Sequence, residues 1–145
     1  MEDRLLDLEL LMRFYVCTAF QNSRAHNVVR DALRGHGHEI TLDWTSGMPE
    51  EDPEKIGILE VDAVLEADFV CVLLPGGRGT HAELGVALGQ RIPVLLYARD
   101  ETDLLDDRGM TCPFYHHPQV ARIHGSLSEY VEKVLAWCRT GEFGE

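Results

Sequence analysis

The stretch Phe69-Val-Cys-Val-Leu-Leu-Pro-Gly-Gly-Arg-Gly-Thr-His-Ala-Glu83 decides the fold of this 145-residue chain. Its first six residues form an unbroken apolar run of strand length, which is typical of a parallel strand covered on both faces. The glycine-rich loop 75–79 then leads into a helix predicted over 80–88 and closed by Gly89. A buried strand, a short loop and a helix together form the repeating unit of an α/β fold.

The same alternation of apolar runs and helical patterns extends in both directions. The other predicted strands are 14–18, 39–43, 92–98 and 120–123, and the other predicted helices run from Asn22 or Ser23 to Gly35, over 53–67 and over 126–138, the last with a Ser126-x-x-Glu129 capping box. We therefore expect a single flavodoxin-like, Rossmann-like domain over 13–141, a doubly wound parallel five-stranded sheet in the order 2-1-3-4-5. Residues 1–12 are expected to be an N-terminal extension, helical over 1–11.

Composition and charge exclude several classes of function. Hydrophobic residues make up 45% of the chain and charged residues 26%, as in ordinary globular domains. The 25 acidic and 13 basic residues give a net charge of −12, which repels nucleic-acid phosphates and anionic membranes, so we expect neither as a partner. The four cysteines show no C-x-x-C spacing, which favours reduced thiols and a cytoplasmic protein.

The predicted fold places a ligand at the carboxyl ends of strands 1 and 3, where the strand order reverses. The loops that meet there are 18–23 and 75–80. The second opens a helix, so its free N–H groups and the helix dipole favour an anion. Its sequence is neither a Walker A loop nor G-x-G-x-x-G. Thr80-x-x-Glu83 also fits a capping box, in which Glu83 would only cap the helix.

One carboxylate lies in an unusual place on the predicted helix 53–67. On a helical wheel Asp62 and Glu66 share a narrow polar face, whereas Glu60 falls among apolar residues. This position predicts burial of Glu60 and a raised pKa, which suits a proton-transfer role.

Several segments carry a resemblance to a known family. Phe14-Tyr-Val-Cys-Thr-Ala-Phe20, Asp43-Trp-Thr45, Ala67-Asp68 and Gly77-Arg-Gly-Thr-His-Ala-Glu-Leu-Gly85 resemble the nucleoside 2-deoxyribosyltransferase family, which includes nucleotide N-glycosidases. The resemblance covers about residues 13–98. It implies a flavodoxin-like fold, no cofactor, and base exchange or hydrolysis at the N-glycosidic bond of a nucleoside or nucleotide. Glu83 would be the nucleophile on the anomeric carbon, as carboxylates are in retaining glycosidases.

The resemblance also implies roles for other residues. Glu60 stands where the family usually has its second acid, eight residues before Asp68, with Asp62 as the alternative. Tyr15 would orient the catalytic carboxylate, although it could equally be a packed strand tyrosine. In the nucleotide-cleaving branch an Arg of the first loop grips the 5′-phosphate. Gln21 stands there in this chain, so Arg78 or Arg24 would replace it.

The remaining candidates lie around the same crevice. Asp43 and Trp44 would flank the base, unless Trp44 is simply part of the core. His117, in the segment Tyr115-His-His117, would contribute to a neighbouring subunit's site in a homodimer or higher homo-oligomer. The pair His36 and His38 lacks a third ligand, so we expect no metal. The remaining predicted substrate-binding residues come from the two loops: Thr18, Phe20, Gly76, Gly77, Arg78, Gly79 and Thr80.

Two alternatives remain open. Pro75 to Glu83 also matches the P-G-G-x-G-T-x-x-E motif of the Lonely Guy phosphoribohydrolases, but the segment 58–66 lacks that family's Arg-Lys pair. The other alternative is a non-catalytic nucleotide-binding or cofactor-binding carrier. The position of Glu60 discriminates between an enzyme and a carrier, because a passive carrier has no reason to hold a second carboxylate beside Glu83.

Overall fold

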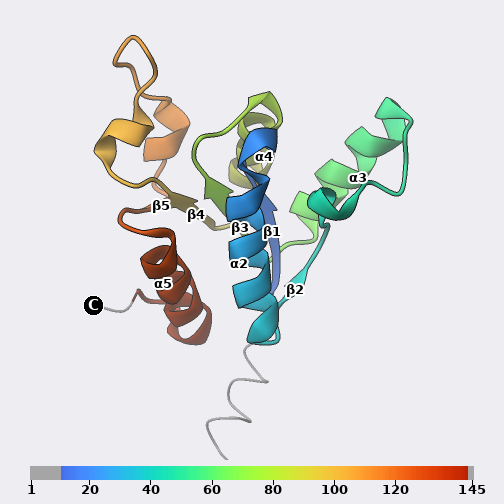
Figure 1. The fold of residues 1–145 in the computed structure, drawn as a ribbon, viewed down its shortest axis with the longest axis horizontal. Helices are drawn as coiled ribbons and strands as arrows, with labels where there is room; N and C mark the ends of the chain where they lie inside the picture. Colours follow the sequence, from blue (N-terminus) through green and yellow to red (C-terminus); the bar gives the residue numbers. More distant parts are fainter. Residues whose placement is uncertain (1–10, 144–145) are drawn as a thin grey trace, which may run out of the picture.

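The computed structural model describes residues 11–143, so the expected helix over 1–11 lies almost wholly outside the described residues. Five parallel strands form one sheet in the order β2-β1-β3-β4-β5. Their bounds are β1 Arg13–Cys17, β2 Glu39–Ile40, β3 Phe69–Leu73, β4 Val94–Tyr97 and β5 Val120–Ile123. The predicted α/β class and strand order are confirmed (Figure 1).

Four α-helices cover the two faces of the sheet. They are α2 Ser23–Gly35, α3 Pro53–Leu65, α4 Arg78–Gly89 and α5 Leu127–Thr140. Alternate residues of β1 face opposite layers: Phe14 and Val16 pack with α2 and α5, whereas Tyr15 and Cys17 pack with α3 and α4. Tyr15 therefore lies on the same side of the sheet as Glu60 and Glu83, the other two predicted catalytic residues.

The second strand is shorter than predicted. It ends at Ile40, and residues Trp44–Ser46 form a 3₁₀ helix, η2, in place of the end of a strand over 39–43. The Asp43 carboxylate accepts a hydrogen bond from the Thr45 N–H and caps this turn. Local hydrogen bonding by an aspartate has therefore overridden the strand pattern.

Helix α4 begins two residues earlier than predicted, and the Thr80–Glu83 capping box, the alternative role considered for Glu83, does not form. Gly77 is the N-cap residue, and its N–H donates to the Thr80 hydroxyl at 3.0 Å. Thr80 is thus the third residue of the helix, and Glu83 lies a full turn inside it, where it caps nothing. The capping box of Ser126 and Glu129 in α5 is confirmed.

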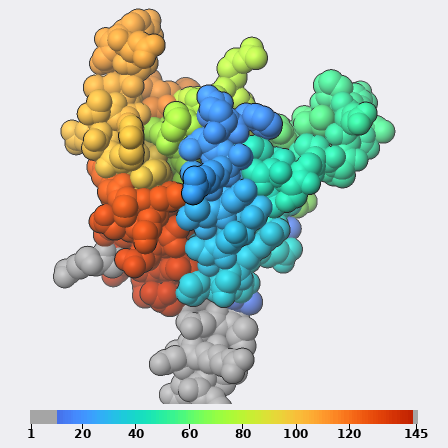
Figure 2. Space-filling view, viewed as in Figure 1, coloured from blue at the N-terminus to red at the C-terminus, as the bar shows by residue number. Residues whose placement is uncertain are grey.

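The carboxyl-terminal edge of the sheet is flanked by two projecting segments. Figure 2 shows residues around 99–117 rising on one side and the N-terminal part of α3 on the other, with the glycine-rich loop between them. The first segment includes the 3₁₀ helices η3 Glu101–Leu104 and η4 Pro113–His116. Within residues 11–143, no helix is long and apolar enough to cross a membrane.

Candidate active site

A cavity of about 390 Å³ lies at the carboxyl ends of β1 and β3, where the fold predicts a ligand. Both predicted loops contribute to it, together with Glu60 of α3 and Glu83 of α4. Its lining residues are Tyr15, Thr18, Ala19, Phe20, Gln21, Trp44, Glu60, Gly76, Gly77, Arg78, Gly79, Thr80 and Glu83. The structure therefore brings together all three predicted catalytic residues and most of the predicted substrate-binding residues.

Tyr15 and Glu83 form the floor of this cavity. Tyr15 is 1% exposed, and its hydroxyl donates a hydrogen bond of 2.5 Å to Oε2 of Glu83. Burial, followed by the negative charge of Glu83, raises the pKa of Tyr15 well above its usual value, so the phenol remains a donor. The bond fixes one carboxylate oxygen and leaves Oε1 available for a ligand.

Glu60 lines the same cavity from α3 and is partly buried, as its place on the helical wheel predicts. Burial raises its pKa. Burial also raises the pKa of Glu83 to about 7, the Tyr15 hydrogen bond opposes this rise, and the charge of Glu60 adds to it. Within the described residues, no Lys or Arg forms an ion pair with Glu60 or Glu83. Perturbed carboxylates that face one cavity are a mark of catalytic sites.

The glycine-rich loop lines the same cavity as Glu60. Among the described residues, no acceptor takes the backbone N–H groups of Arg78, Gly79 and Thr80, the first three residues of α4. These donors and the helix dipole suit an anionic group. A Cβ at Gly76 would lie 2.9 Å from Cγ2 of Thr80, so any other residue there would displace the Thr80 side chain.

The two loops are tied to each other by short hydrogen bonds. The Thr18 hydroxyl donates to the carbonyls of Leu73 at 2.7 Å and Pro75 at 3.1 Å, and it accepts from the side chain of Asn22. The Ala19 N–H also donates to the Pro75 carbonyl. Thr18 is itself buried, so its contacts fix the shape of the cavity.

An aromatic wall closes the side formed by η2. The Trp44 indole N–H donates to the Val16 carbonyl at 2.9 Å, and its ring lies 6.3 Å from that of Phe20, centroid to centroid. Phe20 is 84% exposed at the cavity mouth. His26 packs edge-on against Trp44 from below, and its buried Nε2 has no hydrogen-bond partner in the described part of the chain. Phe20 and Trp44 both line the cavity, and their rings offer an apolar surface to a planar ligand.

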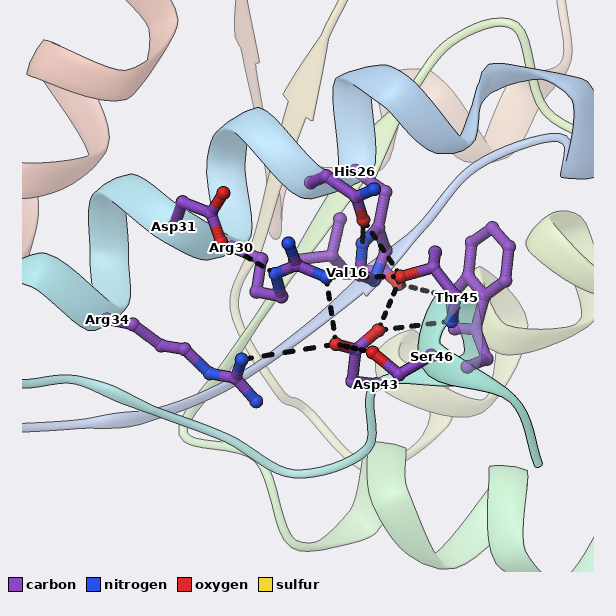
Figure 3. Close-up of polar contacts among 10 residues, drawn as sticks. Val16, His26, Arg30, Asp31, Arg34, Asp43, Thr45 and Ser46 are labelled. Atoms are coloured by element: carbon purple, nitrogen blue, oxygen red, sulfur yellow. Dashed lines mark hydrogen bonds and ion pairs between the residues drawn. The ribbon is translucent and has the colours of Figure 1, made fainter. Parts of the chain in front are cut away.

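Asp43 holds this wall in place from outside the cavity. Figure 3 shows Arg30 and Arg34 of α2 reaching the Asp43 carboxylate from one side and Thr45 and Ser46 meeting it from the other. Burial alone would raise the pKa of Asp43, but the hydrogen bonds from Thr45, Ser46 and Arg30 hold it well below its usual range. The structure thus places Asp43 in a network that supports Trp44, and the cavity lining does not include it.

Three further predicted residues also lie away from the cavity. Asp62 is exposed on the polar face of α3, which leaves Glu60 as the carboxylate on the cavity side. His117 is exposed and accepts a hydrogen bond from the Gln119 N–H. Arg24 is exposed and outside the lining, whereas Arg78 is in it.

The histidines considered as a metal pair make separate backbone contacts. His38 accepts from the Met12 N–H, and Nδ1 of His36 lies 3.0 Å from the Ala32 carbonyl. Within residues 11–143, no group of three or more His, Cys, Asp or Glu side chains is arranged to hold a metal ion.

Sequence analysis missed one pair of residues beside the site. His81, on the first turn of α4, contacts the Tyr115 hydroxyl through its imidazole. Both residues line a second cavity, of about 470 Å³, which shares Gly76 with the first. His81 stands at a variable position inside the motif and Tyr115 is 34 residues later, so local spacing gives no indication of the pair.

No protein-family model and no curated protein matches this sequence. The fold does resemble solved structures. One is the CMP N-glycosidase BcmB of Clostridium botulinum, with a TM-score of 0.63 and 21% identity over 86% of this chain and 98% of that one. Another is BlsM, with a TM-score of 0.62 and 14% identity over 89% of this chain and 90% of that one. At these identities the likeness establishes the fold.

Proposed function

We propose that this protein cleaves the N-glycosidic bond of a nucleoside 5′-monophosphate, with Glu83 as nucleophile and Glu60 as acid and base. The observation that carries the proposal is the pair of carboxylates in one cavity without a cation between them. Holding two such groups together costs electrostatic free energy, which a passive carrier has no reason to bear. The resemblance of the fold to a CMP N-glycosidase supports the same activity and makes CMP the first substrate to test.

The proposed reaction has two steps. In the first, Oε1 of Glu83 attacks the anomeric carbon, and the bond from this carbon to the base nitrogen breaks. The departing base keeps the electron pair of that bond and accepts a proton from the carboxyl group of Glu60. In the second, Glu60 takes a proton from water, whose oxygen attacks the anomeric carbon and releases the Glu83 carboxylate. The products are the free base and a pentose 5-phosphate.

The residues around the two carboxylates support binding of the rest of the nucleotide. The free N–H groups at the start of α4, with Arg78 in the lining, suit the 5′-phosphate. The surface formed by Phe20 and Trp44 suits a planar base. Phe20 leaves the mouth open to solvent, which favours water over a second base as the acceptor. Base exchange by a transferase is the alternative outcome.

The test is chromatographic. The wild type and Glu83→Ala are incubated with CMP, the other nucleoside monophosphates, their 2′-deoxy forms and the free nucleosides, with and without a second free base. Release of base from monophosphates, absent in Glu83→Ala, is the expected result. Base exchange lost in the same variant would instead establish a transferase. Release of adenine alone would favour the Lonely Guy alternative. If no compound is cleaved while nucleotides raise the melting temperature of both proteins equally, the protein is a carrier.

A further inference from the structure

His81 connects the glycine-rich loop to a distant part of the chain. Its Nδ1 lies 2.7 Å from the Gly77 carbonyl oxygen, and its Nε2 lies 2.6 Å from the Tyr115 hydroxyl. Gly77 precedes α4, and Tyr115 belongs to η4 in the segment before β5. Neither His81 nor Tyr115 lines the catalytic cavity, so neither has a part in the reaction proposed above.

The acceptor at one end determines how the imidazole is protonated. A carbonyl oxygen can only accept, so Nδ1 of His81 must carry the hydrogen that faces Gly77. In the neutral ring Nε2 is then an acceptor, and the Tyr115 hydroxyl donates to it. Tyr115 thereby stabilises the one neutral tautomer that can donate to Gly77.

Holding the Gly77 carbonyl has a consequence on the opposite side of the peptide unit. In a planar trans peptide the C=O of Gly77 and the N–H of Arg78 point in opposite directions. The His81 imidazole therefore helps to direct the Arg78 N–H away from itself, and Arg78 lines the catalytic cavity. The Gly77 carbonyl also accepts the first helical hydrogen bond of α4, from the backbone N–H of His81 at 3.2 Å, so the imidazole is a second donor that reinforces the orientation of this peptide unit.

The far end of this connection is firmly held. Tyr115 is 7% exposed, and its carbonyl accepts a hydrogen bond of 3.0 Å from Nη1 of Arg122 in β5. The His81 ring also lies against the loop, because a Cβ on Gly76 would be 3.2 Å from its Cε1. The chain Arg122, Tyr115, His81 and Gly77 thus ties the loop to the edge of the sheet.

From this chain of contacts we propose that His81 and Tyr115 are positioning residues that set the affinity of the glycine-rich loop for a phosphate group. The inference rests on the proposed function, because it takes the loop as the site of the 5′-phosphate. A preorganised donor costs no reorganisation when the anion binds, whereas a peptide unit held only by the helical hydrogen bond from the His81 N–H must be ordered further at that moment. Removing the contact should therefore weaken phosphate binding and leave bond cleavage largely intact.

The test compares three substitutions. Asn places an amide N–H close to the position of Nδ1, so His81→Asn keeps the donor to Gly77, whereas His81→Leu removes it and Tyr115→Phe removes the group that selects the tautomer. With the best monophosphate substrate, we expect His81→Leu to raise KM about tenfold, the worth of one hydrogen bond, with kcat changed less than about twofold. His81→Asn should stay near the wild type, and Tyr115→Phe should lie between.

Two controls separate the possible outcomes. The dissociation constant of inorganic phosphate, measured by titration calorimetry, should rise about tenfold in His81→Leu and little in His81→Asn, whether or not the protein is an enzyme. Cleavage of the free nucleoside should be equal in all variants. Equal losses of kcat on nucleoside and monophosphate would show that His81 has only a structural role. The inference would also be overturned if His81→Leu bound phosphate as tightly as the wild type, or if neither protein bound it detectably. Absence of any cleavage, with phosphate binding weakened as expected, would reject the proposed function alone.

Discussion

Two carboxylate clusters adjoin Trp44, and they differ in what surrounds them. Asp43 has Arg30 at 2.9 Å, hydrogen bonds from Thr45 and Ser46, and a side chain that is 10% exposed. Glu83 has the Tyr15 hydroxyl and, across the cavity, a second carboxylate. The pKa of Asp43 is held well below its usual range, whereas burial raises that of Glu83 to about 7.

The difference separates a structural carboxylate from a reactive one. Asp43 is charged and fully paired, so its charge stabilises the folded chain at neutral pH. Glu83 destabilises the folded chain when it is charged, and no cation in the described residues offsets this. Proteins keep such strain mainly at functional sites. Substituting residues in each cluster should therefore affect stability in one case and activity in the other.

The largest effect is expected for Glu83→Gln, which removes the nucleophile but retains an amide that can meet Tyr15. Cleavage of the substrate identified by the chromatographic panel should fall by at least about 10³-fold in kcat, since an amide at this position cannot form the glycosyl intermediate. Quenched-flow or chromatographic rates measure this loss. Retention of more than a tenth of the activity would remove Glu83 from the mechanism.

The same variant should be more stable at neutral and alkaline pH. A folded-state pKa of about 7 above an ordinary 4.5 means that Glu83 contributes stability that is present below pH 4.5 and is lost as pH rises through 7. This shift corresponds to about 3 kcal/mol, and we expect about 2 kcal/mol because the side chain stays partly in water. Urea unfolding at pH 5 and pH 8 should show the loss in the wild type and not in Glu83→Gln.

Asp43→Ala tests the other cluster. Asp43→Ala leaves Arg30 with only the exposed Asp31 as a carboxylate partner and removes the cap of η2, so the free energy of unfolding should fall by about 3 kcal/mol. Asp31→Ala is the matched control, because Asp31 pairs with the same Arg30 but is 66% exposed, and it should cause no measurable loss. The difference in unfolding free energy between the wild type and Asp43→Ala should vanish in acid. The folded state lowers the pKa of Asp43, so its contribution to stability is present above pH 3.8 and is lost as the pH falls through the pKa of Asp43 in the folded state. If Asp43→Ala is folded under the assay conditions and its kcat/KM is nevertheless strongly reduced, Asp43 contacts the substrate after all.

The sequence alone predicts the fold well because every level of the pattern agrees. Buried apolar strands, glycine-closed helices and the order of the elements all favour one doubly wound sheet, and the five strands were placed within a few residues. The wheel position of Glu60 was informative for the same reason, since a carboxylate on an apolar helix face must meet a cavity or the core. The errors arose at Asp43 and Thr80, where side-chain hydrogen bonds to nearby backbone decide a turn or a helix start.

The parts that the sequence did not predict depend on contacts across the chain. The Tyr115 hydroxyl reaches His81 over 34 residues, and sequence analysis gave Tyr115 no role while it predicted that His117, two residues away, contributes to a neighbouring subunit's site. Asp43 was expected beside the base because it ends a predicted strand, yet its carboxylate pairs with Arg30, 13 residues earlier. Neither the Tyr115–His81 pair nor the Arg30–Asp43 pair follows a helical or strand periodicity in the sequence, so only the folded structure could identify these contacts.

Glu60→Gln should have a smaller effect than Glu83→Gln. Loss of a general acid typically lowers kcat by about 10²-fold, and a leaving base that protonates readily should reduce the loss. Asp62→Asn is the matched control on the same helix, since Asp62 is exposed and outside the cavity, and its kcat should be unchanged. Equal effects of the two variants would contradict the assignment of Glu60.

The smallest effect, about tenfold in kcat/KM, is expected for Tyr15→Phe, because one hydrogen bond to Glu83 is lost while the carboxylate remains. The pH profile makes this variant informative. The Tyr15 hydrogen bond lowers the pKa of Glu83 and the charge of Glu60 raises it, so the rise of kcat/KM with pH should move to higher pH in Tyr15→Phe and to lower pH in Glu60→Gln. Opposite displacements cannot come from a general loss of packing, which would lower the rate at every pH. Displacements in the same direction would mean that the acidic limb belongs to a group other than Glu83.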